Sequence, residues 1–93
     1  MRAEEILTSA SATLISRGAD RDQEEERSML SAVALFNQMT GAEMSEEDGW
    51  AFMICLKLAR AYNGPVTFNA DHFIDLAGYA ALLGESWGKH DSN

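Results

Sequence analysis

Hydrophobic residues recur every three or four positions in four separate segments of this chain, a spacing that is typical of amphipathic helices. Glycine or proline interrupts the pattern at Gly18, Gly41 and Gly64-Pro65, where glycine favours the end of a helix and proline prevents its continuation. β-Branched residues are sparse, so no strand is expected. The pattern therefore predicts an all-α fold with helices over approximately these ranges: 3–17, 24–40, 45–62 and 70–85.

The third helix has the clearest start, because Ser45 is followed three residues later by Asp48 in a pattern that resembles a capping box. Gly78 lies within the fourth segment, where glycine costs roughly 1 kcal/mol relative to alanine and so indicates a close contact between helices. Short loops favour antiparallel neighbours. We therefore expect one domain, residues 1–86, folded as a compact antiparallel four-helix bundle, and a disordered tail over residues 87–93.

The length and composition narrow the class of protein further. A chain of 93 residues forms one domain that buries a modest fraction of its surface, and the bulky Trp50 and Trp87 add to that surface, so a homodimer or larger oligomer is expected. The single cysteine, Cys55, cannot form an internal disulfide. No apolar run is long enough to span a membrane, and the acidic start does not resemble a signal peptide. A cytoplasmic location is expected.

The formal net charge is −8. Phosphate backbones repel such a protein, so direct binding to nucleic acid is disfavoured. Two roles for the acidic residues stay open. Clustered carboxylates can hold a hard cation such as Mg²⁺, and an acidic surface can compete with nucleic acid for a basic protein partner.

Two groups of carboxylates are candidates for a metal site. One group lies at the predicted start of the second helix and includes Glu25 and Glu26, although the helix dipole alone would also favour acids there. The other group is Asp71 and Asp75, which lie with Tyr79 along one helical face. Two aspartates on one face repel each other unless a basic residue or a divalent cation lies between them.

Lys57 and Arg60 lie three residues apart on one helical face, and both side chains suit phosphate oxygens. They could instead be a surface pair that balances nearby acids. The turn at residues 63–65 should fold the third and fourth helices together, which brings Lys57 or Arg60 towards Asp71 or Asp75. Glu25 or Glu26 is expected near the same cleft. No nucleotide phosphate loop, serine hydrolase motif or zinc protease motif is present, so an enzyme of this sequence would activate water with a metal ion.

Two stretches, WAFMICLKLAR over residues 50–60 and DHFIDLAGYAAL over residues 71–82, resemble small phage and prophage proteins described as MazG-like or dATP/dGTP pyrophosphohydrolase-like. Arg21-Asp22, the Glu26–Met29 segment and Phe36-Asn37 match the same pattern. The resemblance implies a MazG-like helical fold and a Mg²⁺-dependent nucleoside triphosphate pyrophosphohydrolase. It assigns the phosphates to Lys57 and Arg60, and the metal to these carboxylates: Glu25, Glu26, Asp71 and Asp75.

Two departures from the wider enzyme pattern leave other functions open. The segment that begins Glu25-Glu26 lacks the final acid of the EExxE motif, and Asp71 and Asp75 are four residues apart rather than three. A relative that binds a nucleotide without hydrolysing it is therefore one alternative. The other is a non-enzymatic acidic phage protein that binds and inhibits a host factor or a defence system, for example a CRISPR complex.

Overall fold

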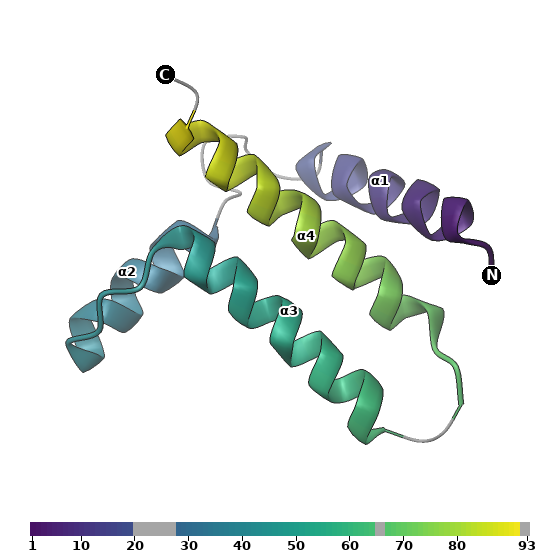
Figure 1. The fold of residues 1–93 in the computed structure, drawn as a ribbon. Helices are drawn as coiled ribbons and strands as arrows, with labels where there is room; N and C mark the ends of the chain where they lie inside the picture. The colour runs from purple at the N-terminus through teal and green to yellow at the C-terminus, as the bar shows by residue number, and fades with distance from the viewer. Residues whose placement is uncertain (20–27, 65–66, 92–93) are drawn as a thin grey trace.

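The computed structural model describes residues 1–19, 28–64 and 67–91, and these form four helices and no strand. In chain order the helices are α1 (Ala3–Ala19), α2 (Ser28–Thr40), α3 (Glu46–Asn63) and α4 (Ala70–Asp91) (Figure 1). The predicted all-α class is confirmed. Residues 24–27, which were expected to open the second helix, lie outside the described residues.

Polar side chains fix the starts of α3 and α4. The Ser45 hydroxyl accepts a hydrogen bond from the Asp48 backbone N–H (3.1 Å), and the Asp48 carboxylate accepts one from the Ser45 N–H (2.9 Å), which confirms the capping box. The Asn69 side chain accepts from the Asp71 N–H (3.0 Å) at the start of α4. These bonds satisfy backbone donors that have no partner within the helix.

The turn between α2 and α3 is held by glycine and asparagine. Gly41 follows α2 with a φ of 78°, a left-handed conformation that glycine adopts without strain, so the predicted stop is confirmed. The Asn37 side chain donates to the Met44 carbonyl (2.9 Å) and accepts from the Met44 N–H (3.0 Å). This paired contact ties α2 to the residue before the α3 cap.

The fourth helix is longer than the sequence predicted. It was expected to end near Glu85, with a disordered tail over residues 87–93, but α4 continues to Asp91. The predicted end of the helix was therefore wrong, and residues 92–93 lie outside the described residues. Ser86 explains the extension, because its side chain is buried and its hydroxyl donates a hydrogen bond to the Glu47 carboxylate on α3. This contact holds the last turns of α4 against the neighbouring helix.

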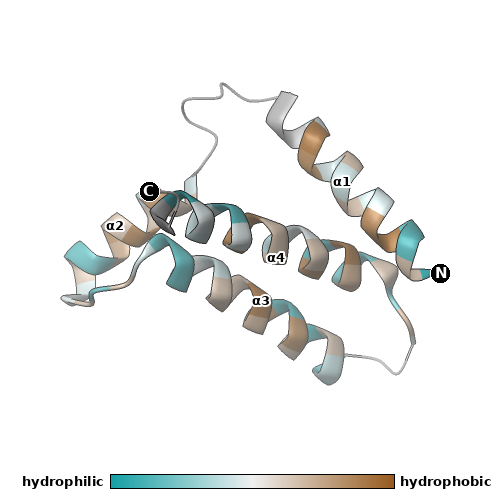
Figure 2. Ribbon diagram, turned by 45° about the horizontal axis from the view of Figure 1, so that its top comes forward, coloured by the Kyte–Doolittle hydropathy of each residue, from teal (hydrophilic) through white to brown (hydrophobic). Residues whose placement is uncertain are grey.

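The four helices make an open arrangement around α4. Helices α3 and α4 run antiparallel side by side, α1 lies against the other side of α4, and α2 crosses the start of α3 and points away (Figures 1 and 2). Among the described residues, α1 contacts no helix but α4, and α2 none but α3. The predicted compact antiparallel four-helix bundle is therefore not confirmed. The radius of gyration is 14.6 Å, whereas a compact domain of this length has about 12 Å.

Few side chains are removed from water in this arrangement. Ala10 and Val33 are the buried hydrophobic residues of the described chain, and no large side chain there is completely buried. The accessible surface is 6778 Å², whereas a compact monomer of this mass exposes about 5,300 Å². None of the described helices combines the length and the apolar character that crossing a membrane requires.

Candidate functional site in the interface between α3 and α4

Lys57 and Asp75 form an ion pair between α3 and α4, with 2.8 Å between Nζ and the nearer carboxylate oxygen. The side chains are 15% and 23% exposed, so both charges are largely withdrawn from water. The expected approach of the basic residues of the third helix to the aspartates of the fourth is therefore confirmed for this pair. It arises because the two helices fold back on each other after Asn63, which brings the middle of α3 opposite the first half of α4.

Further side-chain contacts join the same two helices. Three contacts occur in sequence along the interface: Glu47 with Ser86, Trp50 with Tyr79, and Lys57 with Asp75. The residue number falls on α4 as it rises on α3, as an antiparallel pair requires. The three α3 residues share one helical face, because they are separated by three and seven positions. The interface thus contains charged, hydroxyl and aromatic groups where an ordinary helix pair would place aliphatic side chains.

The aromatic pair lies beside the ion pair. The ring centroids of Trp50 and Tyr79 are 6.0 Å apart with a 30° angle between the ring planes. Tyr79 follows Asp75 by one helical turn, so the rings and the charges are neighbours on α4. The Trp50 indole N–H also donates to the Glu46 carboxylate (3.2 Å). This arrangement places flat apolar rings, on which a base can stack, beside a cation that can bind a phosphate.

Sequence reasoning missed Glu46, Glu47 and Ser86 as members of this interface. It interpreted the two glutamates as part of a helix start, and Ser86 lay at the predicted end of the domain. Both glutamates are half-buried, and their carboxylates accept the hydrogen bonds from Trp50 and Ser86 described above. Glu47 could have been identified from its position on the side of the helix that also carries Trp50, three residues later.

The other predicted site residues are less closely gathered. Asp71 is exposed in the first turn of α4, and Arg60 is exposed near the end of α3. Within the described part of the chain, no hydrogen bond or ion pair joins Arg60 to Asp71 or Asp75. Glu25 and Glu26 lie outside the described residues.

The described residues do not by themselves form a magnesium site. Among the side chains that the structure describes, no group of three His, Cys, Asp or Glu residues is arranged to hold a metal ion. Asp75 is already paired with an ammonium group, so it would have to exchange Lys57 for a cation. A Mg²⁺ ion takes oxygen ligands, usually from one or two carboxylates together with water and substrate phosphates.

One family model matches the chain over residues 5–86, which is most of its length, and its description is a domain of unknown function, DUF6378. No curated protein and no solved structure matches the chain. The match covers all of α2 and α3 and most of α1 and α4, and it includes both residues of the ion pair.

Proposed function

The chain belongs to the DUF6378 family, and we propose that it binds a nucleoside triphosphate beside Lys57 and Asp75, as a MazG-like pyrophosphohydrolase or a nucleotide-binding relative. The observation that carries the proposal is the largely buried ion pair next to the Trp50–Tyr79 ring pair. The resemblance of the same two helices to dATP/dGTP pyrophosphohydrolase-like phage proteins supplies the substrate class. On this proposal the protein acts in the cytoplasm of a bacterial host.

An ion pair between two packed helices is unfavourable as a stability device. Removing two charges from water costs several kcal/mol per ion, and apolar residues of similar volume often stabilise such a site equally well. Withdrawn charges with a specific partner are, by contrast, common where proteins bind or transform charged ligands. The pair could also fix the alignment of α3 against α4, and ligand binding distinguishes the two roles.

Each residue has a defined task in the proposed site. The Lys57 ammonium, separated from Asp75, donates hydrogen bonds to phosphate oxygens, and Arg60 supplies a second cation from the same helix. Asp75 and Asp71, together with Glu25 and Glu26 from outside the described residues, would hold Mg²⁺. The ion would neutralise phosphate charge and make a water molecule more acidic. Hydrolysis between the α and β phosphates yields a nucleoside monophosphate and pyrophosphate.

Pyrophosphate release from a panel of deoxynucleoside triphosphates with Mg²⁺ tests the enzymatic form of the proposal. We expect Lys57→Met to lower the rate at least about tenfold, because a charge-assisted hydrogen bond contributes about 1.5–3 kcal/mol. Arg2→Met is the matched control, since it also removes one positive charge but from an exposed ion pair with Glu4. An equal effect of both variants would assign the loss to net charge and refute the site.

Binding without pyrophosphate release would identify the nucleotide-binding relative. The second candidate function is the acidic inhibitor of a host factor or defence complex, and the net charge of −8 favours it. That function predicts competition with nucleic acid for a basic host protein and requires no nucleotide. If no nucleotide is bound or hydrolysed under any condition, the acidic inhibitor becomes the better account.

A further inference from the structure

Helix α2 carries no charged side chain and is mostly exposed. Its 13 residues contain no Asp, Glu, Lys or Arg, although 24% of the chain is charged. Val33 is its buried residue, whereas large hydrophobic side chains on other faces remain exposed: Leu30 (59%), Leu35 (58%), Phe36 (47%) and Met39 (77%). An apolar helix of this kind is stable in water when another surface covers it.

Beyond its first turn, the side of α3 that faces away from α4 is uncharged as well. Lys57 marks the inner face, and the positions on the opposite face between residues 51 and 62 are all exposed: Ala51, Phe52, Cys55, Leu58, Ala59 and Tyr62. Phe52 is 63% exposed and Tyr62 is 85% exposed. In Figure 2 the first turn of α3 is hydrophilic and its middle turns are hydrophobic. Exposed apolar residues along the outward side of a helix are typical of a surface that another surface covers.

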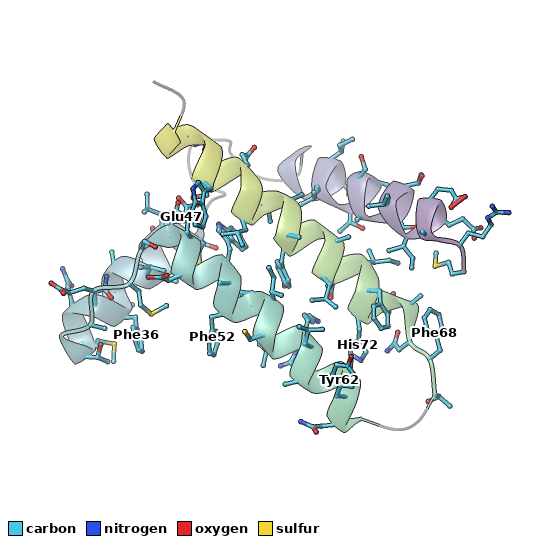
Figure 3. All side chains as sticks on the ribbon, viewed as in Figure 1. Phe36, Glu47, Phe52, Tyr62, Phe68 and His72 are labelled. Carbon is cyan, nitrogen blue, oxygen red and sulfur yellow. The ribbon has the colours of Figure 1, made fainter. Side chains whose placement is uncertain are left out.

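The two uncharged surfaces belong to one face of the molecule. Figure 3 shows Phe36 of α2 and Phe52 of α3 projecting on the same side, in the angle between the two helices. The Asn37–Met44 hydrogen bonds fix that angle. We name this surface the α2–α3 face and define it by these residues: Phe36, Met39, Phe52 and Cys55.

We propose that the α2–α3 face binds a second copy of this chain. The accessible surface exceeds that of a compact monomer by roughly 1,500 Å², and a stable dimer buries about 800 Å² on each partner. With so few buried side chains, the fold needs a partner that is always present. A second copy meets that requirement, as it does in obligate homodimers.

The distribution of charge supports a second copy over other occupants. Two copies with a net charge of −8 repel each other least where the surfaces that meet carry no charge, and the residues that define the α2–α3 face are uncharged. A basic protein would gain from acidic surface, which this face does not offer. An anionic membrane would repel the chain as a whole. The inference is independent of the proposed nucleotide site, which lies on the opposite side of α3.

The first experiment is sedimentation equilibrium on the full chain with Phe52→Glu as the test variant. Leu7→Glu is the matched control, because Leu7 on α1 is also 63% exposed and lies outside the α2–α3 face. We expect a dimer of the unmodified chain, at least about a 30-fold increase in the dissociation constant for Phe52→Glu, and no change for Leu7→Glu. A monomer at about 100 µM, or equal effects of both variants, would overturn the proposal.

A second measurement is informative even if Phe52→Glu does not fold. Cys55 is the single cysteine and is exposed in one copy, so its reaction with a thiol reagent reports whether the face is covered. If the chain is a dimer, the Cys55 thiol of the folded protein should react slowly at high protein concentration. Dilution separates the two copies, so the reaction rate should then rise and approach the rate of the urea-unfolded chain. A rate equal to that of the unfolded chain at every concentration would overturn the proposal.

Discussion

Gly49 lies where α2 crosses α3, and replacing it with alanine should weaken that crossing. A Cβ atom at this position would lie 2.4 Å from the Met29 sulfur and 2.9 Å from a Val33 methyl carbon, whereas carbon atoms normally approach to about 3.5–4.0 Å. The Met29 side chain is flexible and can move away. Val33 is buried and β-branched, so its methyl group moves only if the α2 backbone moves.

The magnitude follows from two opposing contributions. Alanine in a helix interior is more favourable than glycine by roughly 1 kcal/mol, and overpacking a tight contact costs about 1–3 kcal/mol. We expect Gly49→Ala to lower the free energy of unfolding by roughly 0–2 kcal/mol. Gly84 on α4 is the matched control, because nothing lies within 4 Å of an added Cβ there. Gly84→Ala should raise the free energy of unfolding by roughly 0.5–1 kcal/mol.

Urea unfolding followed by far-ultraviolet circular dichroism measures both variants, at one protein concentration so that any association affects them equally. The expected result is a midpoint that falls or stays unchanged for Gly49→Ala and rises for Gly84→Ala. An increase in stability for Gly49→Ala as large as that for Gly84→Ala would refute the crossing of α2 at Gly49.

Three further predictions use the same unfolding measurement. Asp75→Leu should lower the free energy of unfolding by roughly 1–3 kcal/mol, because Lys57 then keeps an unpaired and largely buried charge. Adding Lys57→Met should restore most of this loss, and a double variant no more stable than Asp75→Leu alone would contradict the prediction. Asn37→Ala removes both hydrogen bonds to Met44 and should cost about 1–2 kcal/mol, and an unchanged midpoint would count against the turn described here. Ser45→Ala removes the α3 cap and should lower the free energy of unfolding by about 1 kcal/mol. An unchanged free energy of unfolding would show that the start of α3 does not depend on this cap.

Local signals in the sequence predicted the helices well. The Ser45 capping box and the Gly41 stop are each set by residues within one turn, so they could be identified from neighbouring positions alone. The end of α4 could not, because Gly84 and the polar residues after it resemble a terminus. The contact that extends the helix, Ser86 with Glu47, joins residues 39 positions apart.

The arrangement of the helices was harder to predict than their positions. Exposed apolar residues lie on several sides of α2 and on the outward side of α3, so periodicity does not indicate which face meets a neighbour. The expected contact at Gly78 does lie in the interface of α4 with α1, but an added Cβ would sit an ordinary 3.9 Å from Leu14. Close packing therefore does not require glycine at Gly78.

The candidate site was predicted in part. The sequence predicted that Lys57 or Arg60 approaches Asp71 or Asp75, because a short connection folds their helices together, but it did not single out the pair of Lys57 with Asp75. The neighbouring Trp50–Tyr79 contact and the partners of Glu47 depend on how the two helices rotate about their axes. That rotation is set by the packing of the whole interface rather than by any local motif.

The most direct test of the proposed nucleotide site is calorimetric titration of deoxynucleoside triphosphates with Mg²⁺ into the unmodified chain and the Lys57→Met/Asp75→Leu double variant. The double variant removes both charges while the unfolding measurement shows whether the helix pair survives. We predict that the unmodified chain binds at least one nucleotide and that the folded double variant binds it at least about tenfold more weakly. Equal binding by both proteins, or no binding by the unmodified chain, would contradict the assignment of Lys57 and Asp75 to a nucleotide site.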